Sequence, residues 1–168
     1  MIIESNATII PDSPANTEPA ELQLSSEHQF IRHILIMDDE AIIREIAGRY
    51  IRSMGYAVVE AKDGNEALEL CTDAMKKEIP INGALFDLII PDGLDGKDVI
   101  REFRKKFPDI PVFALSWSTA DPVMIRPSEY GFTGSICKPI RKYELLALLN
   151  KHLKIEEQRQ HLFHCFST

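Results

Sequence analysis

Residues 33–60 have the sequence HILIMDDEAIIREIAGRYIRSMGYAVVE, and this stretch indicates the fold. It begins with a short apolar run, HILIM at 33–37, and ends with a second one, YAVVE at 56–60. Between the two runs, apolar residues recur every three or four positions over 42–54, which is the spacing of an amphipathic helix. Gly55 follows, at the position where a helix favours a C-terminal glycine. The stretch therefore predicts a strand, a helix and a second strand.

The same alternation continues along the chain. Three more strands are predicted at Ala84 to Phe86, Pro111 to Leu115 and Gly134 to Cys137. Helices are predicted at Glu66 to Lys77, Lys97 to Lys106 and Ile140 to about Lys154, with a turn at Asp63-Gly64. A further helix, the fourth of five, is expected between the fourth and fifth strands, and Pro127, five residues after Pro122, should break or shorten it. Five strands that alternate with helices predict a doubly wound α/β fold, (βα)5, with a parallel sheet in the order 2-1-3-4-5.

Composition limits the possible functions. The chain has 168 residues, 45% of them hydrophobic, and a formal net charge of -7. This acidic balance argues against a direct nucleic-acid partner. No apolar run is long enough for membrane insertion, and the start, Met1 to Glu4, lacks the basic region of a secretory signal, so we expect a cytoplasmic protein. Three widely spaced cysteines favour reduced thiols over disulfides.

Polar side chains follow four of the predicted strands. Asp38 and Asp39 follow the first strand, Asp87 the third, Ser116 the fourth and Lys138 the fifth. In the order 2-1-3-4-5 these strands are neighbours, so the five side chains should converge at one edge of the sheet. Three carboxylates this close favour a cation, and an open, hydrated set of oxygen ligands suits Mg²⁺. Lys138 and Ser116 add the positive charge and the hydroxyl donor that a phosphoryl group requires.

Each residue also has a simpler explanation. Asp38 and Asp39 could cap the first helix, and Asp87 could be a turn residue. His161, His164 and Cys165 could suggest a metal site, but no fourth ligand lies near them in the sequence. Three independent coincidences at three adjacent strand ends are less probable than one shared site.

At this point the motifs resemble a known family, the receiver domain of response regulators in two-component signalling, which has a flavodoxin-like fold. The resemblance rests on DDE at 38–40, DLIIPDGLDG at 87–96, Ser116 after a strand, and Lys138-Pro139. DPVM at 121–124 and YGFTG at 130–134 look most like the receivers of hybrid sensor histidine kinases. Residues 1–29 carry three prolines and show no sustained periodicity, so we expect a flexible N-terminal tail there. The receiver domain would span 30–154, and 155–168 would be a C-terminal tail or helix extension.

The resemblance implies a role for each site residue. Asp87 would accept a phosphoryl group from the phosphohistidine of a sensor histidine kinase or a phosphotransfer protein. Asp39 would bind Mg²⁺ directly and Asp38 largely through water, together with Asp87 and the backbone carbonyl of Ile89. Lys138 and Ser116 would contact the phosphoryl oxygens, and Pro139 would follow a cis peptide. The fourth helix, fifth strand and fifth helix would form the face that binds a downstream partner.

Some residues depart from the family pattern. Trp117 stands where a small residue is usual, Ser135 replaces an aromatic residue, and the loop at 91–96 is one residue longer than the common form. Three function classes remain. We expect a free-standing, phosphorylation-dependent switch that is not an enzyme. The alternatives are a pseudo-receiver that binds proteins without being phosphorylated, and an Mg²⁺-dependent phosphatase, which would need a second carboxylate where Ile89 stands.

Overall fold

Five parallel strands form one sheet in the order β2-β1-β3-β4-β5, as predicted. The computed structural model describes residues 31–153, and the predicted tails lie outside this range. The strands are β1 (His33–Met37), β2 (Ala57–Ala61), β3 (Ile81–Asp87), β4 (Val112–Ser116) and β5 (Gly134–Cys137). Because every strand runs in the same direction, all five carboxyl ends lie at one edge of the sheet.

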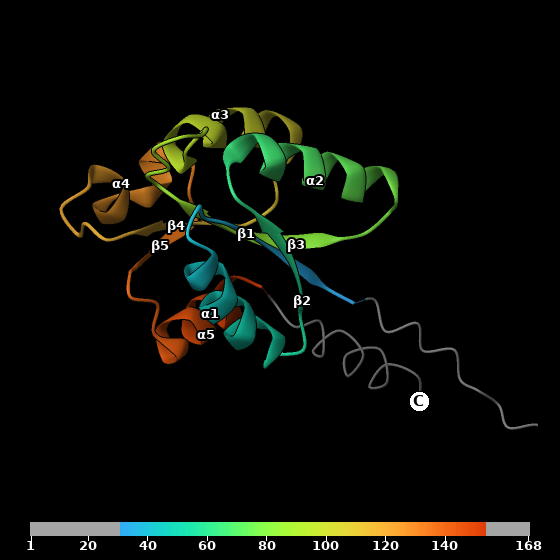
Figure 1. Cartoon of the computed structure of the whole chain (residues 1–168), viewed down its shortest axis with the longest axis horizontal. Helices are drawn as coiled ribbons and strands as arrows, with labels where there is room; N and C mark the ends of the chain where they lie inside the picture. Colours follow the sequence, from blue (N-terminus) through green and yellow to red (C-terminus); the bar gives the residue numbers. More distant parts are fainter. Residues whose placement is uncertain (1–30, 154–168) are drawn as a thin grey trace, which may run out of the picture.

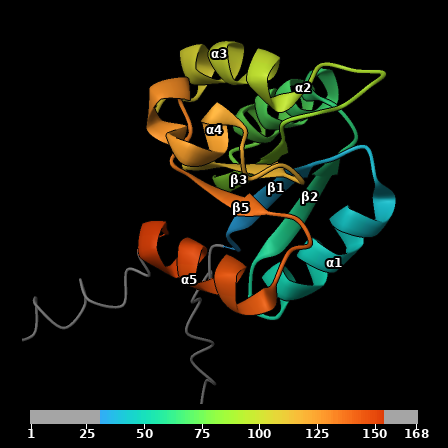
Figure 2. The ribbon, with the colours of Figure 1, turned by 90° about the vertical axis from the view of Figure 1, so that its left-hand side faces the viewer.

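Helices cover both faces of the sheet (Figures 1 and 2). α1 (Ala41–Arg52) and α5 (Lys142–His152) lie on one face, and α2 (Gly64–Lys76) and α3 (Gly96–Lys106) lie on the other. α4 (Pro122–Ile125) is a single turn, followed by the 3-10 helix η1 (Pro127–Tyr130). Pro127 therefore ends the fourth helix early, as expected. No helix within residues 31–153 is long and apolar enough to cross a membrane.

The sheet separates two hydrophobic cores. Successive side chains of a strand point to opposite faces, so Leu35 and Met37 pack under α2 and α3 while Ile34 and Ile36 pack against α1 and α5. All four are fully buried. Burial on both faces explains why β1 has a continuous apolar sequence and not an alternating one.

Several predicted boundaries were wrong, each for a local reason. Asp63-Gly64 is not a free turn, because the Asp63 side chain accepts the Glu66 backbone N–H at 3.0 Å and caps α2, which begins at Gly64. The third strand begins at Ile81 and not at Ala84, because it pairs with β1 from His33 onward. The last helix begins at Lys142, because Ile140 is buried in the core before the helix starts. The second and fourth strands each lie one residue later than predicted.

Candidate functional site

Three carboxylates meet at the carboxyl edge of the sheet, as predicted. Asp38 and Asp39 follow β1, and Asp87 ends β3, the neighbouring strand. One carboxylate oxygen from each of the three lies within 4.8 Å of the others. Asp38 and Asp87 are buried, whereas Asp39 is exposed. Arg44 of α1 fixes the turn that carries the acidic pair, because its guanidinium donates to the backbone carbonyls of Asp38 and Asp39 at 2.6 and 3.1 Å.

Lys138 links the two buried carboxylates. Its side chain is completely buried, and its Nζ lies 2.7 Å from Oδ2 of Asp87 and 2.7 Å from Oδ2 of Asp38. The contact with Asp87 is a hydrogen bond. The contact with Asp38 is an ion pair by distance but lacks hydrogen-bond geometry, so Oδ2 of Asp38 is a buried oxygen without a hydrogen bond. The bond between Lys138 and Pro139 is cis, as predicted.

Ser116 and Ile89 also lie at this edge. Ser116 ends β4 beside Cys137 of β5, is buried, and accepts the Ser118 backbone N–H on its hydroxyl at 3.1 Å. Ile89 donates its backbone N–H to Oδ1 of Asp87 at 3.2 Å. Asp95 of the following loop caps α3 by accepting the N–H groups of Lys97 and Asp98.

Burial raises the pKa values of both buried carboxyl groups, whereas contacts with these groups raise the pKa of Lys138. Burial raises the pKa of Asp38 to about 6, with a further contribution from Asp87, although the contact with Lys138 opposes the rise. Burial likewise raises the pKa of Asp87, against the opposing effect of Lys138. For Lys138, burial lowers the pKa, but contacts with Asp38 and Asp87 outweigh it and leave the pKa above its usual value. One lysine therefore faces two buried acids and the exposed Asp39, and the site has an excess of negative charge.

These residues suit a small divalent cation. The donor set consists of carboxylate oxygens, which hard cations such as Mg²⁺ prefer. The buried Oδ2 of Asp38 makes no hydrogen bond, and the exposure of Asp39 leaves room for the water ligands that Mg²⁺ retains. Asp38, Asp39 and Asp87 are therefore the residues that would hold the ion.

The sequence interpretation did not include Glu40 in the site. Its Oε1 lies 3.7 Å from Nζ of Lys138 and accepts the indole N–H of Trp117 at 3.3 Å. Nζ of Lys138 lies 5.7 Å from the centre of the Trp117 ring, which is a cation–π distance. Glu40 directly follows the acidic pair in the sequence, which indicated that it lies near the site. Nothing in the sequence indicated its contact with Trp117, 77 positions away.

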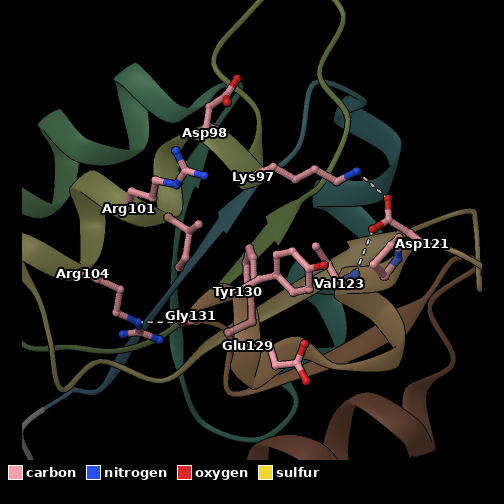
Figure 3. Close-up of a pocket in the computed structure, with 12 residues that line it drawn as sticks. Lys97, Asp98, Arg101, Arg104, Asp121, Val123, Glu129, Tyr130 and Gly131 are labelled. Carbon is pink, nitrogen blue, oxygen red and sulfur yellow. Dashed lines mark hydrogen bonds and ion pairs between the residues drawn. The ribbon is translucent and has the colours of Figure 1, made fainter.

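A separate pocket of about 520 Å³ lies between α3 and the α4–η1 segment. Lys97 of α3 forms an ion pair with the carboxylate of Asp121 at 2.5 Å. Arg104 donates a hydrogen bond to the backbone carbonyl of Gly131, and both contacts are drawn in Figure 3. Ile100, Val123 and Phe132 line it with apolar atoms. None of the three clustered carboxylates lines this pocket, so it is not part of the acidic site.

Comparison with known proteins identifies the family. The sequence profile of the response regulator receiver domain matches residues 34–150, which is most of the chain. The chain belongs to the response regulator receiver family. The structure of the chemotaxis protein CheY4 of Vibrio cholerae is 26% identical in sequence, with a TM-score of 0.63 over 73% of this chain and 99% of that one. The receiver domain of NtrX from Brucella abortus is 24% identical and has the same fold, with a TM-score of 0.63 over 72% of this chain and 98% of that one.

Curated relatives of this receiver domain are longer proteins. The probable transcriptional regulator ycf27 of Porphyridium aerugineum is 37% identical over 121 residues, which cover 72% of this chain and 48% of the relative. The cyclic di-GMP phosphodiesterase of Thermotoga maritima is 30% identical over 133 residues, covering 79% of this chain and 33% of that protein. The chain thus spans about half the length of the first relative and about a third of the length of the second. What it shares with them is a signalling domain of two-component systems, a family in which phosphorylation and Mg²⁺ are general features.

Proposed function

We propose that this receiver domain is a phosphorylation-dependent switch in which Asp87 accepts a phosphoryl group from phosphohistidine on a histidine kinase or phosphotransfer protein. The observation that carries the proposal is the Asp87–Lys138 pair beside Asp38 and Asp39. A carboxylate that is hydrogen-bonded to a buried lysine and lies next to two further carboxylates matches the requirements of phosphoryl transfer, which depends on positioning and charge neutralisation.

In this reaction an oxygen of Asp87 forms the new P–O bond while the P–N bond of phosphohistidine breaks. The donor's other ring nitrogen carries a proton, so the electron pair of the broken bond leaves on neutral imidazole. The N–H of Ile89 holds Oδ1 of Asp87 and the ammonium of Lys138 holds Oδ2, so both carboxylate oxygens are oriented before the donor arrives. Lys138 then keeps its charge next to the transferred group, because its pKa is raised.

Mg²⁺ bound at Asp38, Asp39 and Asp87, with the Ile89 carbonyl, would supply positive charge to the phosphoryl oxygens. Ser116 lies at the end of the strand next to β3, where its hydroxyl would donate to a phosphoryl oxygen after releasing the Ser118 N–H. Reorientation of Ser116 would then report phosphorylation to the segment that follows β4.

The output face is proposed to be α4–β5–α5. Ile125 of α4 and Tyr143 of α5 are large apolar side chains that are 64% and 65% exposed. The hydroxyl of Ser135 on β5 donates to the backbone carbonyl of Met124 at 3.0 Å and so couples β5 to α4. This hydrogen bond occupies the place where the family more often has an aromatic ring, and a downstream protein would recognise the face through a different contact.

The test is incubation of the full chain with Mg²⁺ and acetyl phosphate, followed by intact mass measurement. We expect the wild-type chain to gain one phosphoryl group and Asp87→Asn to gain none. Asp92→Asn, which changes an exposed carboxylate in the loop after β3, is the matched control and should load normally. Phosphorylation of Asp87→Asn would place the acceptor elsewhere. A wild-type chain that does not load would favour the pseudo-receiver.

A further inference from the structure

Glu40 and Trp117 form an exposed, hydrogen-bonded pair beside Lys138 of the acidic site, and this pair is called the cover below. Glu40 follows β1 and Trp117 follows β4, so the two residues reach the site from different loops. The indole N–H and Nζ of Lys138 both approach the same Glu40 oxygen, at 3.3 and 3.7 Å. Trp117 is 58% exposed and Glu40 is 44% exposed, whereas the Lys138 side chain is completely buried. The exposed Glu40–Trp117 pair therefore lies against a buried lysine.

Asp87 has little accessible surface in this arrangement. The residue is only 4% exposed, although a phosphoryl donor has to bring its phosphorus atom to a carboxylate oxygen. Oδ2 of Asp87 is bonded to the same ammonium that lies 5.7 Å from the centre of the indole ring and 3.7 Å from the Glu40 carboxylate. A donor with a ring as its leaving group needs more room on this side than a donor whose leaving group is ammonia.

We propose that the Glu40–Trp117 hydrogen bond closes the site and that its opening determines which phosphoryl donors can reach Asp87. The inference rests on the proposed function, because it assigns a donor-selecting role to residues beside the proposed acceptor. Glu40 and Trp117 act here as specificity-determining residues. The phosphoryl transfer itself remains the work of Asp87, Lys138 and the groups around them.

The expected size of the effect follows from the single hydrogen bond that holds the cover. A hydrogen bond of typical net strength shifts an equilibrium by about threefold to tenfold. Removing this hydrogen bond should therefore raise the fraction of molecules in which the cover is open by about threefold to tenfold. The rate of loading by a bulky donor should rise by the same factor. Loading by a small donor should increase less, because a small donor requires less opening.

Two pairs of variants separate the hydrogen bond from other effects. Glu40→Ala removes the acceptor, whereas Glu40→Gln keeps an oxygen that can accept the indole N–H. Trp117→Phe keeps an aromatic ring without the N–H, whereas Trp117→Ala removes the ring as well. Tyr130→Ala removes an exposed aromatic ring on η1 and is the matched control. Each changed side chain is at least 44% exposed, so the fold should be preserved, and circular dichroism checks this.

The experiment measures loading of the full chain with two donors, phosphoramidate and monophosphoimidazole, by intact mass in Mg²⁺. The informative quantity is the ratio of the two loading rates. General damage to the site lowers both rates alike and therefore leaves their ratio unchanged. We expect the ratio to shift towards monophosphoimidazole in Glu40→Ala and Trp117→Phe, by about threefold or more. Glu40→Gln should shift it less than Glu40→Ala, and Tyr130→Ala should leave it unchanged.

The outcomes are distinguishable. An unchanged ratio in both Glu40→Ala and Trp117→Phe would overturn the inference while leaving the proposed function intact. A shift in Trp117→Ala without one in Trp117→Phe would show that ring size alone controls access and would also overturn it. Absence of phosphoryl mass in every protein, with both donors, would overturn the proposed function and this inference with it.

Discussion

Replacing Asp38 with asparagine should stabilise the metal-free protein at neutral pH. Asp38 is completely buried, and its pKa is raised from 3.8 to about 6, mainly by burial. At about 1.4 kcal/mol per pKa unit, ionising this carboxyl group costs the fold about 3 kcal/mol. This value already includes the favourable contact with Lys138. Since the buried amide of asparagine also needs hydrogen bonds, we expect a gain of about 1 to 3 kcal/mol for Asp38→Asn.

The pH dependence follows from the raised pKa. Between about pH 4 and 6 the folded protein binds more protons at Asp38 than the unfolded chain does, so wild-type stability falls as pH rises through this range. Asparagine does not titrate, and Asp38→Asn should lack this loss. The difference between the two proteins should therefore be near zero below about pH 4 and reach its full value above about pH 7.

The assay is urea unfolding in EDTA at pH 4 and pH 7.5. With a typical urea dependence of about 2 kcal/mol per molar, the midpoint at pH 7.5 should rise by about 0.5 to 1.5 M. Asp39→Asn is the matched control, because Asp39 is exposed and its replacement should change stability by less than about 0.5 kcal/mol. Mg²⁺ should reduce the gap by stabilising the wild type more than Asp38→Asn. Destabilisation at pH 7.5, or the same gain at pH 4, would refute this reasoning.

Three further predictions concern the metal, a structural arginine and a buried thiol. Titration of Trp117 fluorescence should show that Asp39→Ala removes Mg²⁺ binding more completely than Asp38→Ala, and equal residual affinities would contradict the unequal roles proposed for the two residues. Arg104→Ala should lower the free energy of unfolding, measured in urea, by about 2 kcal/mol, because the guanidinium donates to the carbonyls of Gly131 and Ile110 at 2.8 and 2.5 Å. A loss within about 0.5 kcal/mol, as for a typical surface residue, would show that these hydrogen bonds add little to stability. Cys71 should resist a thiol reagent in the native protein, because burial raises its pKa to about 12 and hides its sulfur; labelling of Cys71 before unfolding, located by peptide mapping, would argue against its burial.

The sequence alone determined the fold and most of the candidate site. Short apolar strands that alternate with amphipathic helices require a parallel sheet covered on both faces, and parallel strands bring their carboxyl ends to one edge. Residues directly after these strands, such as Asp38, Asp87 and Lys138, therefore meet whatever the details of the packing. Their convergence depends only on strand order and residue position. The sequence pattern gives the positions, and the structure has the expected order.

Only the tertiary structure decided which side chains touch. The Lys138 contact with both Asp38 and Asp87, and the Glu40–Trp117 hydrogen bond, join residues 51 to 100 positions apart through specific side-chain conformations. Element boundaries also depended on partners, as in β3, which is extended to Ile81 by pairing with β1. The reason is physical. Periodicity records which face of an element is buried, whereas side-chain contacts and strand ends are set by neighbours that the local sequence does not contain.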